Sequence, residues 1–300
     1  MELNRFFPPP RSFFVDLVER GNAAPLTVDI GGLAFQLNNA DEALRASLAE
    51  RNASFLDSNV AGSFQVRLLD AGKGHFVAPS QVSPGNPHPL SMTWEEKVLL
   101  VQSFGFAGWI DVAARRGELA LGRDEFEKAT WCVENYLRVS TAWRAVEEGG
   151  VLLHAASLVQ DGRGYVFLGA SGSGKSTLAA TSQLGEVISD DLTLVRRLKD
   201  GFHLAGTPFR GTYAGGRPIR GDFPIGGLFR IFKAKVNRLE PCPRNHAVAD
   251  LLAAAPFVVD QLGHDSRILT HLRKLDSAHP LSYLHFNLQG DFWEALDLQR

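Results

Sequence analysis

The chain has 300 residues, of which 45% are hydrophobic and 21% are charged, and its formal net charge is −2. This composition is ordinary for a soluble globular protein, and the length suits one large or two modest domains. So small a net charge gives no sign of a nucleic-acid or membrane surface, and we expect neither partner. The two cysteines, Cys132 and Cys242, show no disulfide framework and no metal-ligand spacing, in agreement with a cytoplasmic location.

The first 149 residues predict a β-rich α+β region of unknown role. Residues 1–24 predict an arm with a short helix over 12–20, without an apolar run long enough for a signal peptide or a membrane span. Helical spacing follows over 41–51, a Pro-rich and Gly-rich loop over 80–89, and a hairpin turn over 115–117. Alternating apolar residues predict strands over 26–37 (as a pair or a bulged strand), 63–69, 75–78, 98–102, 108–114 and 118–121.

The clearest helix is predicted over residues 124–148. Asp124 and Glu127 have the spacing of a capping box at its start. Its apolar stripe, which we expect to face the core, consists of Trp131, Leu137, Trp143 and Val146. The helix ends at Gly149-Gly150, and we place the domain boundary there, between residues 1–149 and 150–300.

A glycine-rich motif of the form G-x-x-x-x-G-K-[ST] dominates the second half. It comprises Gly169, Ala170, Ser171, Gly172, Ser173, Gly174, Lys175, Ser176 and Thr177. Apolar residues 165–168 predict a strand before it, and residues 176–184 predict a helix after it, which is the context of a phosphate-binding P-loop (Walker A). A Gly/Ser-rich turn could match by chance, but the flanking elements argue against that.

The spacing of the motif suits a nucleoside triphosphate with Mg²⁺, such as ATP. Glycines let successive backbone N–H groups converge on one anion, and a helix N-terminus adds positive potential. Lys175 would neutralise the β- and γ-phosphates, and Ser176 would ligate Mg²⁺. Thr177 is a weaker candidate contact, and no short signature distinguishes ATP from GTP.

Two adjacent carboxylates follow the motif. An apolar strand over 151–159 and a turn over 161–164 predict a hairpin into the motif, and residues 186–191 predict a short strand that ends in Asp190 and Asp191. One carboxylate can hold Mg²⁺, and the other can accept a proton from a hydroxyl, which favours a kinase over a simple hydrolase. The alternative is an Asp-Asp turn that only caps the strand.

The order of these features resembles the catalytic domain of HPr kinase/phosphorylase. His154 stands ahead of Gly169 at the spacing of that family, and Ser189-Asp190-Asp191 is similar to its Ala-Asp-Asp segment. The resemblance implies that Asp191 accepts the proton, that Lys175 binds phosphate, that Ser176 and Asp190 hold the metal, and that His154 lies near the transferred phosphate. By itself, a lone histidine in an apolar strand is more often a core residue.

The resemblance covers roughly residues 150–300 and implies a mixed α/β nucleotide-binding core, as in phosphoenolpyruvate carboxykinase, rather than a doubly wound sheet. Arg244-Asn245 with Ala247-Val248 is similar to a late family segment. Pro218 replaces a metal-binding glutamate of the family, which leaves phosphorylase activity open. The N-terminal half does not resemble that of true HPr kinases, which form hexamers, so a homo-oligomer is one of several candidate states.

Three arginines in a glycine-rich stretch, Arg210, Arg217 and Arg220, stand beyond the carboxylates. Arg210 is the candidate that could stabilise charge on a transferred phosphoryl group, with solvated surface arginines as the alternative. Glycines from Gly211 to Gly227 predict a mobile loop that could close over substrate.

The leading hypothesis is an ATP- and Mg²⁺-dependent kinase that phosphorylates a Ser or Thr hydroxyl of a protein or peptide. A small-molecule kinase of the same fold is the second hypothesis. The third is a nucleotide-binding adaptor or assembly factor without phosphotransfer. No motif identifies the phosphoacceptor.

Overall fold

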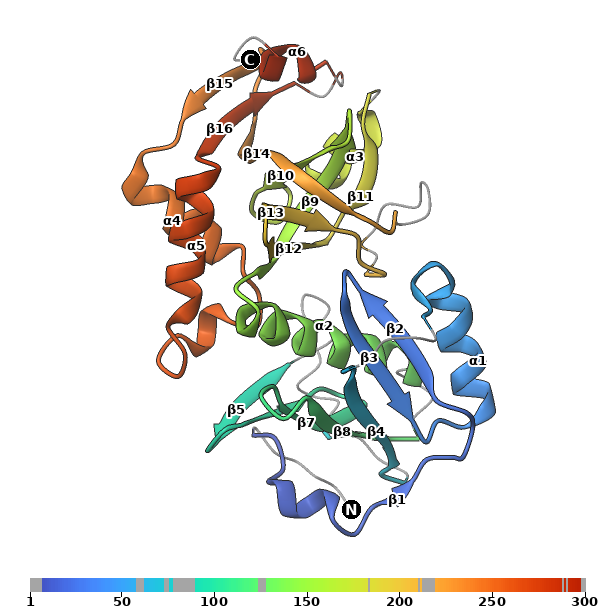
Figure 1. Cartoon of the computed structure of the whole chain (residues 1–300). Helices are drawn as coiled ribbons and strands as arrows, with labels where there is room; N and C mark the ends of the chain where they lie inside the picture. Colours follow the sequence, from blue (N-terminus) through green and yellow to red (C-terminus); the bar gives the residue numbers. More distant parts are fainter. Residues whose placement is uncertain are drawn as a thin grey trace. The chain divides into compact units, whose positions relative to one another are not determined.

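The structure is a computed structural model of the chain. It describes residues 7–57, 62–72, 76–77, 90–123, 128–182, 184–209, 211, 219–287, 289 and 291–297. The chain divides into two compact units, Met1–Thr141 and Ala142–Arg300, each built on a mixed β-sheet with helices (Figure 1). The chain is therefore of mixed α/β class. The division falls inside helix α2 (Ala129–Glu147), before the Gly149-Gly150 boundary expected from the sequence, because the last turns of this helix pack in the second unit.

The N-terminal unit has eight strands in the order β2-β3-β4-β8-β7-β6-β5, with β1 beside β4. The pairs β3–β4 and β4–β8 are parallel, and the remaining pairs are antiparallel. The strands are β1 (Val18–Glu19), β2 (Leu26–Ile30), β3 (Leu33–Asn38), β4 (Phe64–Asp70), β5 (Ser91–Glu95), β6 (Val98–Gln102), β7 (Phe106–Asp111) and β8 (Arg116–Leu121). The predicted strand pair over 26–37 is confirmed as the β2–β3 hairpin, whose turn places Gly31 and Gly32 at positive φ.

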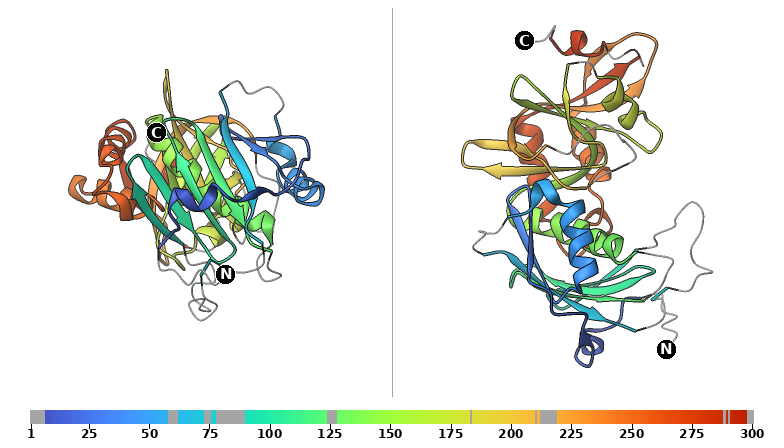
Figure 2. Two further views of the ribbon diagram at one scale, coloured as in Figure 1. Left: turned by 90° about the horizontal axis from the view of Figure 1, so that it is seen from below. Right: turned by 90° about the vertical axis from the view of Figure 1, so that its right-hand side faces the viewer.

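Helix α2 covers one face of this sheet, and the N-terminal arm covers the other (Figure 2). The hydroxyl of buried Tyr136 donates to the Trp109 carbonyl at 2.8 Å, and an added Cβ at Gly117 would lie 2.1 Å from that hydroxyl. On the opposite face, Phe14 of a 3₁₀ turn (Arg11–Phe14) packs in a cluster with Leu100. Alternation along the strands thus supplies two apolar faces, and both are covered.

Helix α1 (Glu42–Arg51) lies beside α2, where the hydroxyls of Ser47 and Thr130 are 2.9 Å apart. The Asp41 carboxylate caps α1 by accepting a hydrogen bond from the Leu44 amide at 2.8 Å. The helix predicted over 41–51 is therefore confirmed, and the structure adds the cap.

Several local predictions for this unit are wrong. The β7–β8 turn lies at residues 112–115, because Arg116 already pairs with Asp111 in the ladder. The side chain of Trp131 is 43% exposed, whereas Leu137, Trp143 and Val146 are buried as predicted. The arm forms the short 3₁₀ turn and β1 instead of a helix over 12–20. Outside the described residues lie Asp124, Glu127, the loop over 80–89 and half of the strand expected over 75–78.

The second unit has its own eight-stranded sheet in the order β10-β9-β12-β13-β14-β16-β15, with β11 beside β9. An additional parallel pairing of β10 with β14 closes five of the strands into a ring. Most neighbours are antiparallel, so the sheet is not doubly wound, as expected. The strands are β9 (Val151–Gln160), β10 (Arg163–Leu168), β11 (Glu186–Ser189), β12 (Leu192–Leu198), β13 (Gly201–Ala205), β14 (Asp222–Lys233), β15 (Arg238–Pro241) and β16 (Leu281–Phe286).

Strand β9 exchanges its partners near its middle. Its pairing with β10 ends where Ala155 meets Leu168, the last residue of β10. Along its other edge, β11 ends opposite Ser157, and β12 begins opposite His154. The chain therefore leaves the sheet twice around His154 and Ala155, once after β10 and once between β11 and β12.

The core of this unit lies between the strands, α3 (Lys175–Thr181) and α6 (Trp293–Asp297). The buried Trp293 ring packs edge-on against Tyr165, with a centroid distance of 5.0 Å, and its Nε1 donates to Ser182 Oγ at 2.9 Å. Ser182 follows directly after α3, so the C-terminal segment anchors the end of that helix. The remaining helices, α4 (Arg244–Ala253) and α5 (Arg267–Ala278), pack against each other.

Among the described residues, no helix combines the length and the apolar character needed to cross a membrane.

Replacing Trp293 by Ala should destabilise the protein by about 3–5 kcal/mol, because the substitution removes a buried ring and leaves a cavity. Urea unfolding followed by far-UV circular dichroism measures this loss. Trp131→Ala removes the same side chain from an exposed position and serves as the control. Equal losses in both variants would contradict the anchoring role of Trp293.

Candidate functional site

The glycine-rich motif lies between β10 and α3, so the expected strand, loop and helix are all present. Within the loop, Gly172 (φ +77°) and Gly174 (φ +103°) adopt left-handed conformations, which only glycine reaches without strain. The Ser173 amide donates to the Ala170 carbonyl at 3.1 Å, and an added Cβ at Gly169 would lie 2.4 Å from Ser173 Oγ. The loop is thus a tight turn that depends on glycine at these places.

Lys175 is held at the mouth of this loop. Its Nζ donates to the carbonyls of Gly169 at 2.7 Å and Ala170 at 3.2 Å, and only 7% of the residue is exposed. Burial lowers the pKa of Lys175 from its ordinary value, and the negative charge of Asp191 opposes that shift. The charged Nζ of Lys175 therefore lies directly beside the loop backbone.

A second turn joins β11 to β12 and carries both carboxylates. Ser189 Oγ donates to the Leu192 carbonyl at 2.9 Å and accepts from the Asp191 amide at 3.3 Å. The side chain of Asp190 accepts a hydrogen bond from the Gly211 amide at 2.9 Å, and the residue is 8% exposed. Both aspartates are thus held by backbone contacts of the turn itself and of a neighbouring segment.

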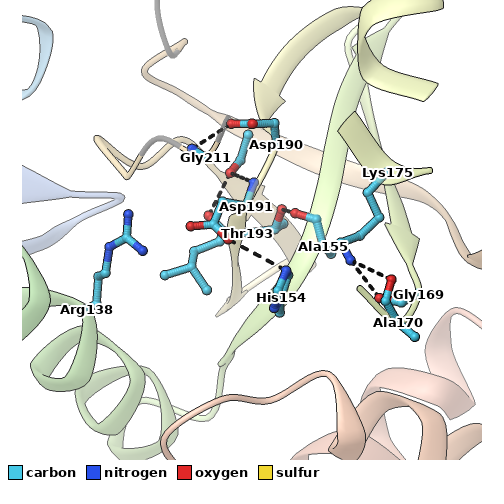
Figure 3. A network of polar contacts seen from close by, with 12 residues as sticks. Arg138, His154, Ala155, Gly169, Ala170, Lys175, Asp190, Asp191, Thr193 and Gly211 are labelled. Carbon is cyan, nitrogen blue, oxygen red and sulfur yellow. Dashed lines mark hydrogen bonds and ion pairs between the residues drawn. The ribbon is translucent and has the colours of Figure 1, made fainter. Parts of the chain in front are cut away.

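His154 faces this turn from β9, as Figure 3 shows. Its Nε2 lies 3.7 Å from Asp191 Oδ1, within ion-pair distance. The backbone fixes both partners, because the Ala155 amide donates to the Asp191 carbonyl at 3.0 Å and the His154 amide donates to the Ala254 carbonyl at 2.6 Å. The imidazole is 47% exposed, so His154 is not the core residue that its apolar strand would predict.

A cavity of about 540 Å³ connects the loop with the second turn. The predicted residues that line it are His154, Ser171, Gly172, Gly174, Lys175, Ser176, Thr177, Asp190 and Asp191. Gly169, Ala170 and Ser173 shape the loop but do not line the cavity. Arg210, Arg217 and Pro218 lie outside the described residues. Residues from segments far apart in the sequence thus meet at one concave site.

The sequence did not single out Lys233, the last residue of β14, which also lines the cavity. Strand β14 runs parallel to β10, with Arg230 opposite Leu168, so it ends at the same edge as the loop. The side chain of Lys233 passes so near the loop that an added Cβ at Gly174 would lie 3.1 Å from its Cε. Only the parallel pairing of distant strands brings this second cation to the site.

Part of the predicted mobile loop is a strand. Gly226 and Gly227 belong to β14, where an added Cβ would collide with the rings of Tyr165 and Phe229 respectively. These glycines therefore allow close packing and do not form a loop.

Ser176, Asp190 and Asp191 offer hard oxygen ligands around one cavity. Mg²⁺ usually takes one or two carboxylates from the protein and completes its octahedron with water and phosphate oxygens. The donor set on this side of the cavity fits that ion.

No protein-family model matches the sequence, and a comparison with curated proteins finds no match either.

Gly211→Ala should destabilise the protein by about 1–3 kcal/mol, because the new methyl group overpacks the turn. An added Cβ would lie 2.5 Å from Asp190 Oδ2 and 2.9 Å from Asp191 Cβ. Gly263→Ala is the control, since an added Cβ there meets nothing within 4 Å. Chemical unfolding measures both variants, and equal stability would contradict the close contact of Gly211 with the aspartates.

Proposed function

We propose that the chain is an ATP- and Mg²⁺-dependent phosphotransferase that acts on a Ser or Thr hydroxyl of a protein or peptide. The observation that carries this proposal is the cavity that brings Lys175 and Ser176 together with Asp190, Asp191 and His154. Phosphoryl transfer depends mainly on positioning and on stabilising charge, and this cavity combines cations, metal ligands and a proton acceptor. In this proposal the second unit is a P-loop core of HPr kinase type.

The phosphate end of the nucleotide would lie on the loop of residues 169–174. Lys175 donates hydrogen bonds to two carbonyls of the loop and would exchange these for phosphate oxygens, which carry more negative charge. Lys233 reaches the same loop from β14 and would contact the phosphates from the other side. Two cations beside one polyphosphate would attract this anion locally, although the net charge of the chain is −2.

Ser176 and Asp190 would hold Mg²⁺, which neutralises phosphate charge when bound. The hydrogen bond from Gly211 fixes the orientation of the Asp190 carboxylate before the ion arrives. A ligand that is already oriented loses little conformational freedom on binding.

Asp191 would act as the general base. It accepts the hydroxyl proton of the acceptor while the acceptor oxygen bonds to the γ-phosphorus and the bond to the β-phosphate oxygen breaks, which leaves ADP. His154 lies 3.7 Å from this carboxylate and is half exposed, so it can pass the proton on to solvent. Its exposure also places the reacting end near the surface, which favours a protein or peptide acceptor over a small metabolite.

Arg210 stays a candidate for stabilising the transferred group, and a homo-oligomer stays a candidate assembly. The cytoplasmic location is part of the same proposal.

Asp191→Asn should reduce phosphoryl transfer about 10²–10⁴-fold with nucleotide affinity retained, because the amide cannot accept the hydroxyl proton. Lys175→Ala should lose nucleotide binding. Mg²⁺-dependent ATP binding is measured by calorimetry, and turnover by release of ADP with and without candidate acceptor peptides.

The matched control is Asp161→Asn in the β9–β10 turn, where φ is +51° and asparagine is tolerated. Full turnover by Asp191→Asn would exclude this residue as the base. Tight binding without turnover in every form, including the wild type, would favour the nucleotide-gated adaptor.

Lys233→Ala should weaken ATP binding about tenfold, or ~1.4 kcal/mol, because one cation leaves the phosphate site. Lys235→Ala removes the same charge from an exposed residue that does not line the cavity. Affinities that fall equally in the two variants would assign the loss to general electrostatics and not to contact with phosphate.

A further inference from the structure

The second unit has another cavity, of about 800 Å³, that shares no residue with the candidate phosphotransfer site. It lies between α5 and the hairpin of β12 (Leu192–Leu198) and β13 (Gly201–Ala205) (Figure 1). We call it the basic groove and define it by Arg197, Lys199, Phe202, Arg273 and Lys274.

Helix α5 presents two different faces. Ile268, Leu272 and Leu275 form the buried apolar face that joins the helix to its unit. Thr270, Arg273, Lys274 and Ser277 follow helical i, i+3, i+4, i+7 spacing along the groove, and all four are exposed. One wall of the groove is therefore a stripe of cations and hydroxyl groups.

The hairpin supplies the opposite wall. The Arg197 guanidinium lies 5.5 Å from the centroid of the Phe202 ring, and this stacking restricts its side chain. Phe202 is buried and Leu198 is half-buried, and both line the groove, while Lys199 is exposed at the turn. Gly201 (φ +135°) allows the tight turn that brings these residues to one side.

The charges of the groove are not balanced. Its four cations, Arg197, Lys199, Arg273 and Lys274, make no ion pair with a carboxylate in the described parts of the chain. Asp200 is the acidic lining residue, and its Oδ2 lies 3.5 Å from Nε2 of His203.

Arg267, on the same helix, shows the contrast. Its guanidinium binds Asp265 at 2.7 Å and Glu147 at 2.9 Å, so the chain neutralises this arginine by itself. Burial and the charges of Lys274 and Arg267 together lower the pKa of His271, and the charge of Asp265 opposes that shift. Positive potential is thus concentrated at the groove of a chain whose net charge is −2.

We propose that the basic groove binds an acidic, extended segment of a partner protein. Carboxylates of that segment would pair with cations on the two walls, and apolar side chains between them would pack on the half-buried Leu198. A single small anion would reach only one wall. The four cations, in contrast, lie on two elements that line a cavity of about 800 Å³. This inference does not depend on the nucleotide site.

The test uses the full chain and a fluorescein-labelled peptide of repeated Glu-Ser-Leu units, with fluorescence anisotropy as the readout. Arg273→Glu combined with Lys274→Glu should weaken binding at least tenfold, and added salt should weaken binding to the wild type. Lys235→Glu combined with Arg244→Glu makes the same charge change at exposed residues outside the groove and should leave binding nearly unchanged. Circular dichroism checks that each variant is folded.

No binding to the wild type, or equal losses in the two double variants, would overturn the proposal. The proposal would also be overturned, in favour of nucleic acid, if an RNA oligonucleotide bound more tightly than the peptide and the groove variant lost that binding. Lys175→Ala should bind the peptide as the wild type does, because Lys175 does not line the groove. Failure of the phosphotransfer proposal would therefore not affect the outcome of this test.

Discussion

The candidate site depends on the exchange of partners along β9. A strand that paired continuously on both edges would leave no backbone free to curve into a loop. Strand β10 ends opposite Ala155 of β9, and β12 begins opposite His154 of β9. The chain therefore leaves the sheet on both edges of β9 at nearly the same position along that strand. The glycine-rich loop follows one departure, and Asp190 and Asp191 occupy the other. His154 lies between them, held by its neighbours in the ladder, so the hydrogen bonds of the sheet position the residues of the candidate site.

Close backbone approach is the second constraint on this unit. Gly169 and Gly211 lie where an added side chain would collide, with Ser173 and Asp190 respectively. The close approach at Gly211 lets its amide reach the carboxylate of Asp190. The site is therefore built largely from backbone geometry, and the side chains of Lys175, Lys233 and Asp191 add charge to a frame that the sheet already determines.

The charged side chains of the second unit are of two kinds: some are paired within the unit, and others have little compensation from it. Arg267 is satisfied by two carboxylates, and Arg230 is paired with Asp250, so these charges stabilise the second unit internally. Lys175 is held by carbonyl oxygens, which are weaker partners than phosphate. The cations of the basic groove have still less compensation from the described residues. Groups that the fold leaves uncompensated are the ones most able to gain free energy from binding.

The sequence by itself determined what short-range patterns encode. Alternation and turn glycines predicted a strand pair where the β2–β3 hairpin lies, and helical spacing predicted α1. The motif around Lys175 predicted its strand, loop and helix. It also proposed nearly all of the residues that line the candidate site. Only the tertiary structure decided that β14 lies parallel to β10, which brings Lys233 to the loop and places Gly226 inside a strand. It also decided that Trp131 lies on the exposed face of α2, and that α5 and the β12–β13 hairpin line one cavity. The physical reason is that local hydrogen bonding and periodicity act over a few residues, whereas strand pairing and packing join segments whose separation in the chain carries no local signal.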